Sequence, residues 1–298
     1  GYSAELSRDL AEIEDEIYKL CGEQFNINST KQLQHILFDK RKLQPGRKTK
    51  TGYSTDTPVL EELAREDPVP ALVLRHRALS KLKSTYVDAL PKLVNRNTGR
   101  IHTNFMQTGT ATGRLSSRDP NLQNIPIKTE EGRRIRSAFV PKAGCVFMSA
   151  DYSQIELVVL AHLSGDPALS KAFTEGTDVH SQTAALIFEV PVDEVSPEQR
   201  RIAKTINFGI MYGMSGFRLS RELGISRQKA DEFITAYFHK YNHIRAFIDK
   251  TVEDVETNGV SKTILGRARK IPGIGSRNRT EKMGAERIAV NTPIQGSA

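Results

Sequence analysis

A stripe of charged and aromatic side chains is the first feature of this sequence that could do chemistry. Within "QRRIAKTINFGIMYG", residues 199–213, Arg200, Lys204, Phe208 and Tyr212 stand at steps of four. Residues four apart are neighbours on a helix, so the stripe would extend over about 18 Å. Two cations can hold a polyphosphate, and two aromatic rings can pack on a sugar and stack beside a base. This order matches a nucleoside triphosphate, and the alternative is a helix with a basic head and a buried aromatic tail.

Acidic residues near position 151 form a second group of candidates. Asp151 ends the apolar run "CVFMSAD" and comes just before the helical pattern "SQIELVVLAHLSGD". A carboxylate at the end of a buried strand could bind a metal ion, although Asp also commonly begins a turn. Ser153 and Glu156 have the spacing of a capping box, which alone would explain Glu156. His180 lies near another expected helix start, as a phosphate donor or as an ordinary polar surface residue.

The elements around these residues are mostly helical. Residues 1 to about 98 read as helices interrupted by a basic loop at about 41–56, which has five Lys or Arg residues and no apolar period. The pattern predicts helices over 57–66 and 70–94, the second broken near Pro91. The first helix is expected to bury Ile13, Ile17, Leu20 and Cys21, and Ser29 or Thr30 is expected to cap the next.

Short strands and turns are expected from Gly99 onward. "RIHTNFMQTGTATGRLSS" alternates in the manner of strands, and "RSAFVPKAGCVFMSAD" contributes two more short apolar runs that end at Asp151. Residues 166 to about 260 read as helical again. The sequence therefore predicts an α+β fold of about two domains.

Charge and composition restrict the class of protein. The 298 residues carry a net charge of +8, and the segment from Pro197 to Lys229 contains seven Lys or Arg residues but only two Glu residues. Such clustering favours a polyanionic partner, because each neutralised phosphate releases counterions. The two cysteines are too few for a disulfide framework, and no apolar run is long enough to span a membrane. The acidic amphipathic N-terminus is not a signal peptide. A reducing cytoplasm fits the low cysteine count, and a monomer is expected.

Several long motifs together resemble family A DNA polymerases, of the bacterial DNA polymerase I type. "DYSQIELVVLAHLSGD" resembles the first polymerase motif of that family, and "RRIAKTINFGIMYGMSGF" resembles its fingers helix. "TATGRLSSRDPNLQNIP" and "EGRRIRSAFVP" are similar to the segment before the first motif, and "NTPIQGSA" to a stretch before the last one. The matches follow the order of the family from about Thr98 to the end, and residues 1–98 resemble the thumb more loosely.

The resemblance implies a right-hand architecture with a helical thumb, an antiparallel-sheet palm and helical fingers. The thumb would cover residues 1–98 with the basic loop at its tip, and the first part of the palm residues 99–165. The fingers would cover residues 166–280, and residues 281–298 would begin the return to the palm.

The resemblance also implies roles for individual residues. Asp151 and the Tyr152 carbonyl would bind two Mg²⁺ ions, for which Mn²⁺ could substitute. Glu156 would exclude a 2′-hydroxyl as a steric gate. The deoxynucleoside triphosphate would contact Gln154, Glu156, His180, Arg200, Lys204, Phe208 and Tyr212. Primer-template DNA would contact Lys48, Lys50, Arg114, Asn124, Arg287, Asn291 and Gln295.

The implied reaction is template-directed DNA synthesis in a bacterial or phage-infected cell. The primer 3′-hydroxyl would attack the α-phosphate, pyrophosphate would leave, and two metal ions would stabilise the attacking and leaving oxygens. Lys204 would offset charge on the leaving group, as a catalytic residue beside Asp151.

The sequence departs from the family pattern at two places. Val158 stands where the first motif usually has Arg, and we expect the loss of a local ion pair and not of catalysis. No "His-Asp-Glu" motif occurs in the 298 residues, although it supplies the second palm aspartate in the family. We therefore expect a fragment whose parent is active and which alone is inactive.

Two other classes of protein share part of these features. "LSRELGISRQKADEFI" has the cadence of a helix-turn-helix, which would suit a DNA-binding regulator without enzyme activity. A single-subunit RNA polymerase would share the fingers motif, but Glu156 argues against it. Lys204 and Phe208 argue against the regulator, which needs neither.

Overall fold

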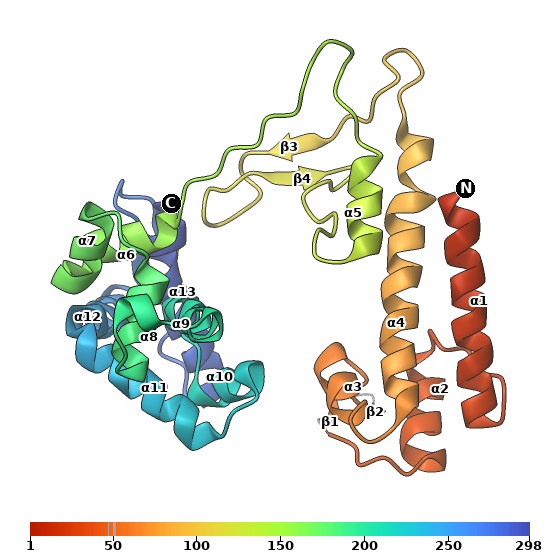
Figure 1. Ribbon diagram of the computed structural model, residues 1–298, viewed down its shortest axis with the longest axis horizontal. Helices are drawn as coiled ribbons and strands as arrows, with labels where there is room; N and C mark the ends of the chain where they lie inside the picture. Colours follow the sequence, from red (N-terminus) through yellow and green to blue (C-terminus); the bar gives the residue numbers. More distant parts are fainter. Residues whose placement is uncertain (47, 50–51) are drawn as a thin grey trace. The chain divides into compact units, whose positions relative to one another are not determined.

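The chain forms two compact units in the computed structural model, which describes residues 1–46, 48–49 and 52–298 (Figure 1). Unit 1 contains residues 1–106 and 116–148, and unit 2 contains residues 107–115 and 149–298. No helix in the described part of the chain is both long and apolar enough to cross a membrane. The unit boundaries do not test where the expected thumb, palm and fingers begin and end.

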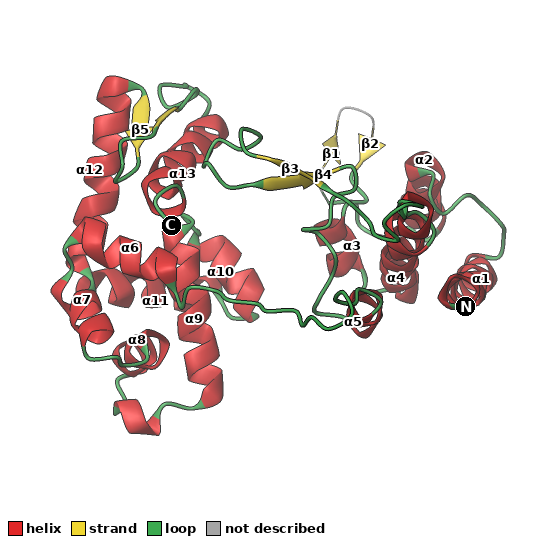
Figure 2. Cartoon of the chain, turned by 90° about the horizontal axis from the view of Figure 1, so that it is seen from above, coloured by secondary structure: helices red, strands yellow, loops and turns green. Residues whose placement is uncertain are grey.

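Two long helices, α1 (Tyr2–Cys21) and α4 (Pro68–Leu82), pack side by side in unit 1 (Figures 1 and 2). Ile13 and Ile17 are buried between elements of this unit, as the helical period predicts. Leu20 is 40% exposed and Cys21 only half-buried, so the expected stripe is wrong at its C-terminal end. The helix ends there, because Gly22 turns left-handed and closes it.

The remaining helices of unit 1 are short and individually capped. Ser29 accepts a hydrogen bond from the Gln32 N–H and caps α2 (Thr30–Gln34), which confirms the expected cap. Asp56 and Asp67 cap α3 (Thr57–Leu63) and α4 in the same way. The other helical segments are η1 (His35–Lys40), η2 (Lys83–Val87), η3 (Leu90–Leu93) and α5 (Glu130–Ser137).

All strands in the described residues pair as two-stranded antiparallel sheets. In unit 1, β1 (Lys48–Thr49) pairs with β2 (Gly52–Tyr53) inside the expected basic loop, and β3 (Asn104–Met106) pairs with β4 (Ser116–Arg118). In unit 2, β5 (Val260–Lys262) pairs with β6 (Ala268–Lys270). These small sheets among many helices confirm the α+β class.

The strand expected to end at Asp151 is absent from the described residues. The backbone from 139 to 152 forms neither helix nor strand, and Val146, Phe147 and Met148 are 85%, 66% and 89% exposed. A strand needs a neighbouring strand for its backbone hydrogen bonds, and none pairs with this segment. The prediction of a buried strand before Asp151 is therefore wrong for this structure.

Unit 2 is a helical assembly around one apolar core. Leu157, Leu160, Ile206 and Tyr237 are among its fully buried side chains. The helical prediction for residues 166 to 260 is confirmed by α7 (Pro167–Thr174), α8 (Val179–Phe188), η4 (Val192–Glu194), α9 (Pro197–Met211), α10 (Gly216–Leu223), α11 (Arg227–Lys240) and α12 (Asn242–Asn258). Helix α6 (Ile155–Ser164) precedes this range, and α13 (Arg279–Gln295) follows it.

Candidate functional site

A full capping box begins helix α9, which carries the cationic and aromatic stripe. The Ser196 hydroxyl accepts the Gln199 N–H, the Gln199 side chain accepts the Ser196 N–H, and Pro197 opens the first turn. The capping box expected at Ser153 and Glu156 is wrong. Gln154 takes a left-handed conformation, so α6 begins at Ile155 and Gln154 is its N-cap residue.

The stripe has the two ends that the sequence predicts. Arg200 and Lys204 are exposed on α9, and Phe208 is half-buried against the core of unit 2. Tyr212 is also half-buried but lies just past the last helical residue, Met211, as the C-cap. The cationic end is therefore open to a ligand, while the aromatic end is fixed by packing.

The guanidinium of Arg200 is paired with a carboxylate that the sequence analysis did not single out. Arg200 Nε donates to Asp178 Oδ2, and Ser181 Oγ donates to the same oxygen at 2.8 Å. Asp178 also caps α8 by accepting the His180 N–H. Burial alone would raise the pKa of Asp178, but the hydrogen bonds from Arg200, Ser181 and His180 outweigh it and lower the pKa to about 2.

His180 lies under this ion pair and is buried, with 2% of its surface exposed. Its ring centroid is 5.7 Å from that of Phe208, and Asn207 Nδ2 donates to its Nδ1 at 3.0 Å. Burial lowers the pKa of His180, so the ring is neutral near pH 7. The alternative of a polar surface residue is therefore wrong, and the structure brings His180 next to Arg200 and Phe208.

A second cluster surrounds the far end of the stripe. The Tyr212 hydroxyl donates to Glu156 Oε2, and Arg114 Nη2 donates to Glu156 Oε1 at 2.6 Å. Burial and then Glu156 raise the pKa of the Tyr212 hydroxyl, and Gln295 and Arg114 oppose that rise. Four residues from distant parts of the sequence thus meet at the C-terminal end of α9.

Helix α13 carries three more of the expected residues at steps of four, Arg287, Asn291 and Gln295. A Cβ added to Gly213 would lie 2.5 Å from Arg287 Cγ, so the aliphatic part of Arg287 packs directly on this glycine. Asn291 Oδ1 is buried without a hydrogen-bond partner. Arg287 and Gln295 therefore both adjoin the residues that end α9.

Comparisons with known proteins identify the family of this chain. The family profile described as "DNA polymerase family A" matches residues 1–298, the whole chain. The chain belongs to DNA polymerase family A. It is 52% identical to "DNA polymerase I, thermostable" of Thermus filiformis over 99% of this chain and 36% of that protein. It is 53% identical to "DNA polymerase I" of Treponema pallidum over 99% of this chain and 30% of that protein.

A solved structure resembles the family A chain over nearly its full length. The structure titled "POL domain of Pol1 from M. smegmatis complex with DNA primer-template and dNTP" covers 99% of this chain and 52% of its own, at 44% identity and a TM-score of 0.89. The fold is therefore that of a polymerase domain. The chain spans about a third of the length of the curated relatives above.

The residues of this family A chain that are expected to bind metal ions do not form a complete metal site. Asp151 and Tyr152 are exposed, Tyr152 by 78%, while Gln154 Oε1 is buried without a hydrogen-bond partner. No group of three or more His, Cys, Asp or Glu residues that could hold a metal ion occurs in the described residues. One carboxylate and one carbonyl do not fit a two-metal site by themselves, because two ions need at least two carboxylates.

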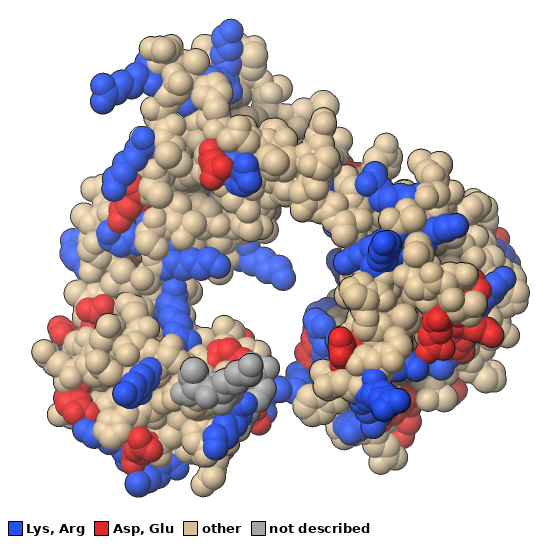
Figure 3. Space-filling view, turned by 180° about the vertical axis from the view of Figure 1, so that it is seen from behind, with Lys and Arg blue, Asp and Glu red and all other residues tan. Residues whose placement is uncertain are grey.

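The remaining DNA-contact predictions of the family A chain lie in unit 1. The backbone carbonyl of Asn124 accepts the Tyr86 hydroxyl at 2.6 Å. Lys48 lies on β1 with its amine 6.0 Å from the Tyr53 ring, and Lys50 lies outside the described residues. Lys and Arg are interspersed with Asp and Glu on the face of each unit that Figure 3 shows, so basic residues are not confined to one of the units.

The two helices expected from the helix-turn-helix pattern are present as α10 and α11, and α11 packs into the core of unit 2. Gly224 ends α10 and Ser226 caps α11, as the sequence predicts. Ala230, Phe233 and Tyr237 of α11 are buried in unit 2, so that face of α11 is not free to enter a DNA groove.

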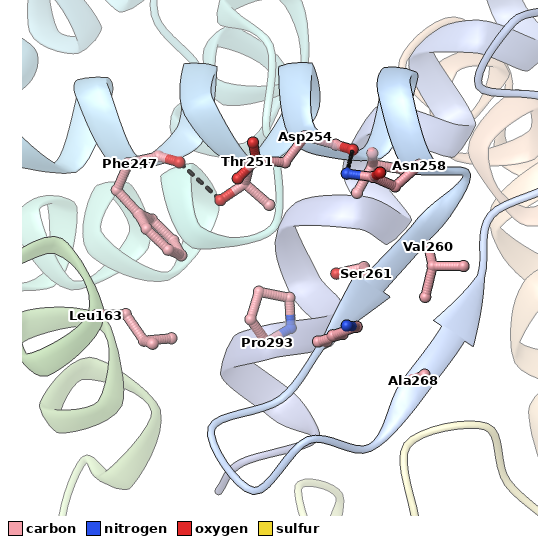
Figure 4. Close-up of a pocket in the computed structure, with 11 residues that line it drawn as sticks. Leu163, Phe247, Thr251, Asp254, Asn258, Val260, Ser261, Ala268 and Pro293 are labelled. Carbon is pink, nitrogen blue, oxygen red and sulfur yellow. Dashed lines mark hydrogen bonds between the residues drawn. The ribbon is translucent and has the colours of Figure 1, made fainter.

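A cavity of about 750 Å³ elsewhere in unit 2 contains none of the expected site residues (Figure 4). Leu163, Phe247 and Pro293 line it with residues of β5 and β6. Its Thr251 hydroxyl donates to the Phe247 carbonyl at 2.7 Å, within α12. Its chemistry is unlike that of the α8–α9 region, and it is not the candidate site.

The sequence did not point to three residues of the site region: Asp178, Ser181 and Asn207. A signal existed for Asp178, which precedes an apolar helix as a capping residue does. No sequence pattern pointed to Asn207, because its contact with His180 depends on how α8 packs on α9.

Proposed function

We propose that this chain supplies the nucleotide-binding and part of the DNA-binding surface of a DNA polymerase. The reaction is addition of a deoxynucleotide to a primer 3′-hydroxyl. A bond forms between that oxygen and the α-phosphorus, the bond to the bridging oxygen breaks, and pyrophosphate leaves. The observation that carries the proposal is the stripe on α9 with its cationic end exposed, in a chain of DNA polymerase family A.

Each proposed role follows the chemistry of the side chain. Arg200 and Lys204 bind the phosphates, Arg200 by exchanging Asp178 for a phosphate oxygen. Lys204 donates a proton or its charge to the leaving pyrophosphate. Phe208 packs on the deoxyribose and Tyr212 lies near the templating base. The M. smegmatis structure, whose title names DNA primer-template and dNTP, supports these ligands.

Glu156 is proposed as the group that excludes ribonucleotides. Its side chain is 13% exposed and is held between Arg114 and Tyr212. A carboxylate fixed on two sides cannot easily move aside for an additional 2′-hydroxyl. Arg114, Arg287, Asn291 and Gln295, together with Asn124, Lys48 and Lys50 of unit 1, are proposed to contact primer and template.

Mg²⁺, or Mn²⁺ in its place, is the proposed metal, with Asp151 and the Tyr152 carbonyl as the ligands from this chain. When bound, the ions would supply positive charge at the reacting phosphates. We further propose that the 298 residues alone do not catalyse synthesis, because Asp151 is the single carboxylate that the described residues offer at the expected metal site. The proposed setting is the cytoplasm, with the protein acting as a monomer.

Primer extension tests the function directly. An intact polymerase that contains these residues should extend a primer with deoxynucleotides only when divalent metal is present, and the isolated chain should not. Lys204→Ala should slow extension by the intact polymerase about 10²-fold or more, while Arg201→Ala should leave the rate unchanged. Arg201 is the matched control because it lies on the same helix and pairs with Glu198. Metal-dependent synthesis by the isolated 298 residues would refute the proposed inactivity.

A further inference from the structure

A chain of buried polar side chains lies directly beneath the stripe. His180 and Thr183 of α8, Asn207 of α9 and Tyr241 at the end of α11 are exposed by 2%, 0%, 0% and 2%. Asn207 Nδ2 donates to His180 Nδ1 at 3.0 Å and to the Thr183 hydroxyl oxygen at 3.1 Å. The Thr183 hydroxyl donates to Asn207 Oδ1 at 3.2 Å, and the Thr183 and Tyr241 oxygens are 3.1 Å apart. Polar groups buried this deeply must satisfy one another.

The hydrogens along this chain can be assigned in one consistent direction. If the Tyr241 hydroxyl donates to Thr183, the Thr183 proton is free to go to Asn207 Oδ1, and the Asn207 N–H goes to His180. Each hydroxyl then donates its one proton, and Thr183 Oγ1, Asn207 Oδ1 and His180 Nδ1 each accept a hydrogen bond. The ring nitrogen that faces Asn207 must be unprotonated, so the proton of a neutral ring lies on Nε2.

Burial, helped by nearby cations, favours the neutral form of the His180 ring, and the choice of tautomer therefore matters. Burial lowers its pKa, Asp178 opposes this, and Arg200 and Lys204 lower the pKa further. Tyr241 and Thr183 approach from the core and carry no charge at neutral pH. A neutral ring donates from one nitrogen only, and the group bonded to the other nitrogen decides which one.

We propose that Asn207 is a positioning residue that fixes His180 in the tautomer with its proton on Nε2, so that Nε2–H is the donor which the ring offers to a nucleotide phosphate. The ligand in this inference rests on the function proposed above, whereas the tautomer does not. Nε2 is not among the described buried atoms that lack a hydrogen-bond partner. Asn207 would thus act on the phosphates through His180 without touching them.

Nitrogen NMR of the complete chain with ¹⁵N-labelled histidine tests the tautomer without any ligand. His180 should show a bare nitrogen at Nδ1 and a protonated one at Nε2 near pH 7, with the resonances assigned through His180→Gln. His76 is an internal reference, since its Nε2 faces Glu14 Oε1 at 2.8 Å and must carry a proton there. A His180 ring protonated on Nδ1, or on both nitrogens, would overturn the proposal in the unmodified chain.

Substitution then tests whether Asn207 causes the tautomer. Asn207→Asp places an acceptor at the same point, so Nδ1 should gain a proton and the ring should titrate at higher pH. Asn258→Asp is the matched control, because that exposed amide bonds only within α12 and should leave His180 unchanged. An Asn207→Asp chain that keeps a bare Nδ1 would overturn the proposal. Should this variant not fold, Asn207→Ser is used, and there the two tautomers should become mixed.

Titration with a deoxynucleoside triphosphate and Mg²⁺ tests the ligand. Binding is followed at the Lys204 side chain, and the His180 Nε2 resonance should move with the same saturation. A shift of the Lys204 resonances without a shift of the His180 Nε2 resonance would overturn the phosphate contact and leave the nucleotide function intact. If neither resonance shifts, the result would count against the nucleotide function itself, while the tautomer result would stand. In the intact polymerase, Asn207→Ser should raise KM for the nucleotide several-fold more than it lowers kcat.

Discussion

The α8–α9 region and the segment that carries Asp151 differ in how the protein holds its chemical groups. Arg200, His180 and Phe208 each have a packed or hydrogen-bonded neighbour from the other helix or from their own. Asp151 lies on exposed backbone without regular structure, preceded by three exposed apolar residues. Helices complete their backbone hydrogen bonds within one segment, whereas a strand depends on partners elsewhere in the chain. A short stretch of sequence is therefore enough to position side chains on a helix, whereas the position of an acid at the end of a strand also depends on distant parts of the chain.

Asp151 gives the largest expected effect and the sharpest contrast between activity and stability. Asp151→Asn should lower primer extension by an intact polymerase about 10³-fold or more, because the carboxylate that would hold the metal ions is lost. The melting temperature of the chain should not change, since Asp151 is exposed. Steady-state extension and thermal unfolding measure the two quantities. Asp193→Asn, at another exposed acid, should alter neither, and a large loss of stability in Asp151→Asn would break the contrast.

Lys204 gives the next effect and tests the exposed end of the stripe. Lys204→Ala should lower kcat about 10²-fold or more, because its charge is proposed to act on the leaving pyrophosphate. Lys204→Arg should restore nucleotide binding more than kcat, since a guanidinium does not release a proton. Single-turnover extension separates the two steps. An unchanged kcat in Lys204→Ala would remove Lys204 from the chemistry.

Glu156 tests the cluster at the aromatic end. Glu156→Ala should raise ribonucleotide incorporation relative to deoxynucleotide incorporation by about 10- to 100-fold, because the space for a 2′-hydroxyl opens. Glu156→Gln keeps the volume while losing the charge toward Arg114, and should keep the exclusion. Competition between the two nucleotide types on one primer measures the ratio. Equal relaxation in both variants would show that charge, and not size, excludes the ribonucleotide.

Asp178 gives the smallest expected effect and tests the ion pair with Arg200 that joins the start of α8 to α9. Its pKa of about 2 lies below the ordinary value of 3.8, so the stability that it contributes is present above about pH 4 and is lost as pH falls toward 2. Asp178→Asn keeps the helix cap and removes the ion pair with Arg200. We expect a loss of about 1 kcal/mol at pH 7, after allowing for solvent screening of a carboxylate that is 35% exposed, and only a small part of that loss near pH 2, where about half of Asp178 is protonated.

The same variant has a second readout at the nucleotide. Without Asp178, Arg200 does not have to exchange one anion for another, so triphosphate affinity should rise several-fold. Denaturation at two pH values and nucleotide titration check the two expectations. A stability difference as large at pH 2 as at pH 7 would show that the ion pair is not its source.

The sequence predicted the helices and the stripe because both depend on local spacing. Arg200, Lys204 and Phe208 lie on α9, and Ser29 caps α2, where period and capping chemistry place them. Ser153 and Glu156 matched a capping pattern equally well, but Gln154 turns left-handed, and Arg114 and Tyr212 hold the Glu156 carboxylate. Those partners are 42 and 56 residues away, which no local pattern reports. The role of Asn207 was hidden for the same reason.

The capping box at Ser196 has a consequence for the approach of a ligand. The N-terminal turn of α9 carries the partial positive charge of the helix dipole, and Arg200 and Lys204 add whole charges just beyond it. The electric potential along α9 therefore falls from its first turn toward Tyr212. In the proposed function, this gradient would orient a diffusing triphosphate tail-first before contact, and raised salt would slow that capture more than it slows release.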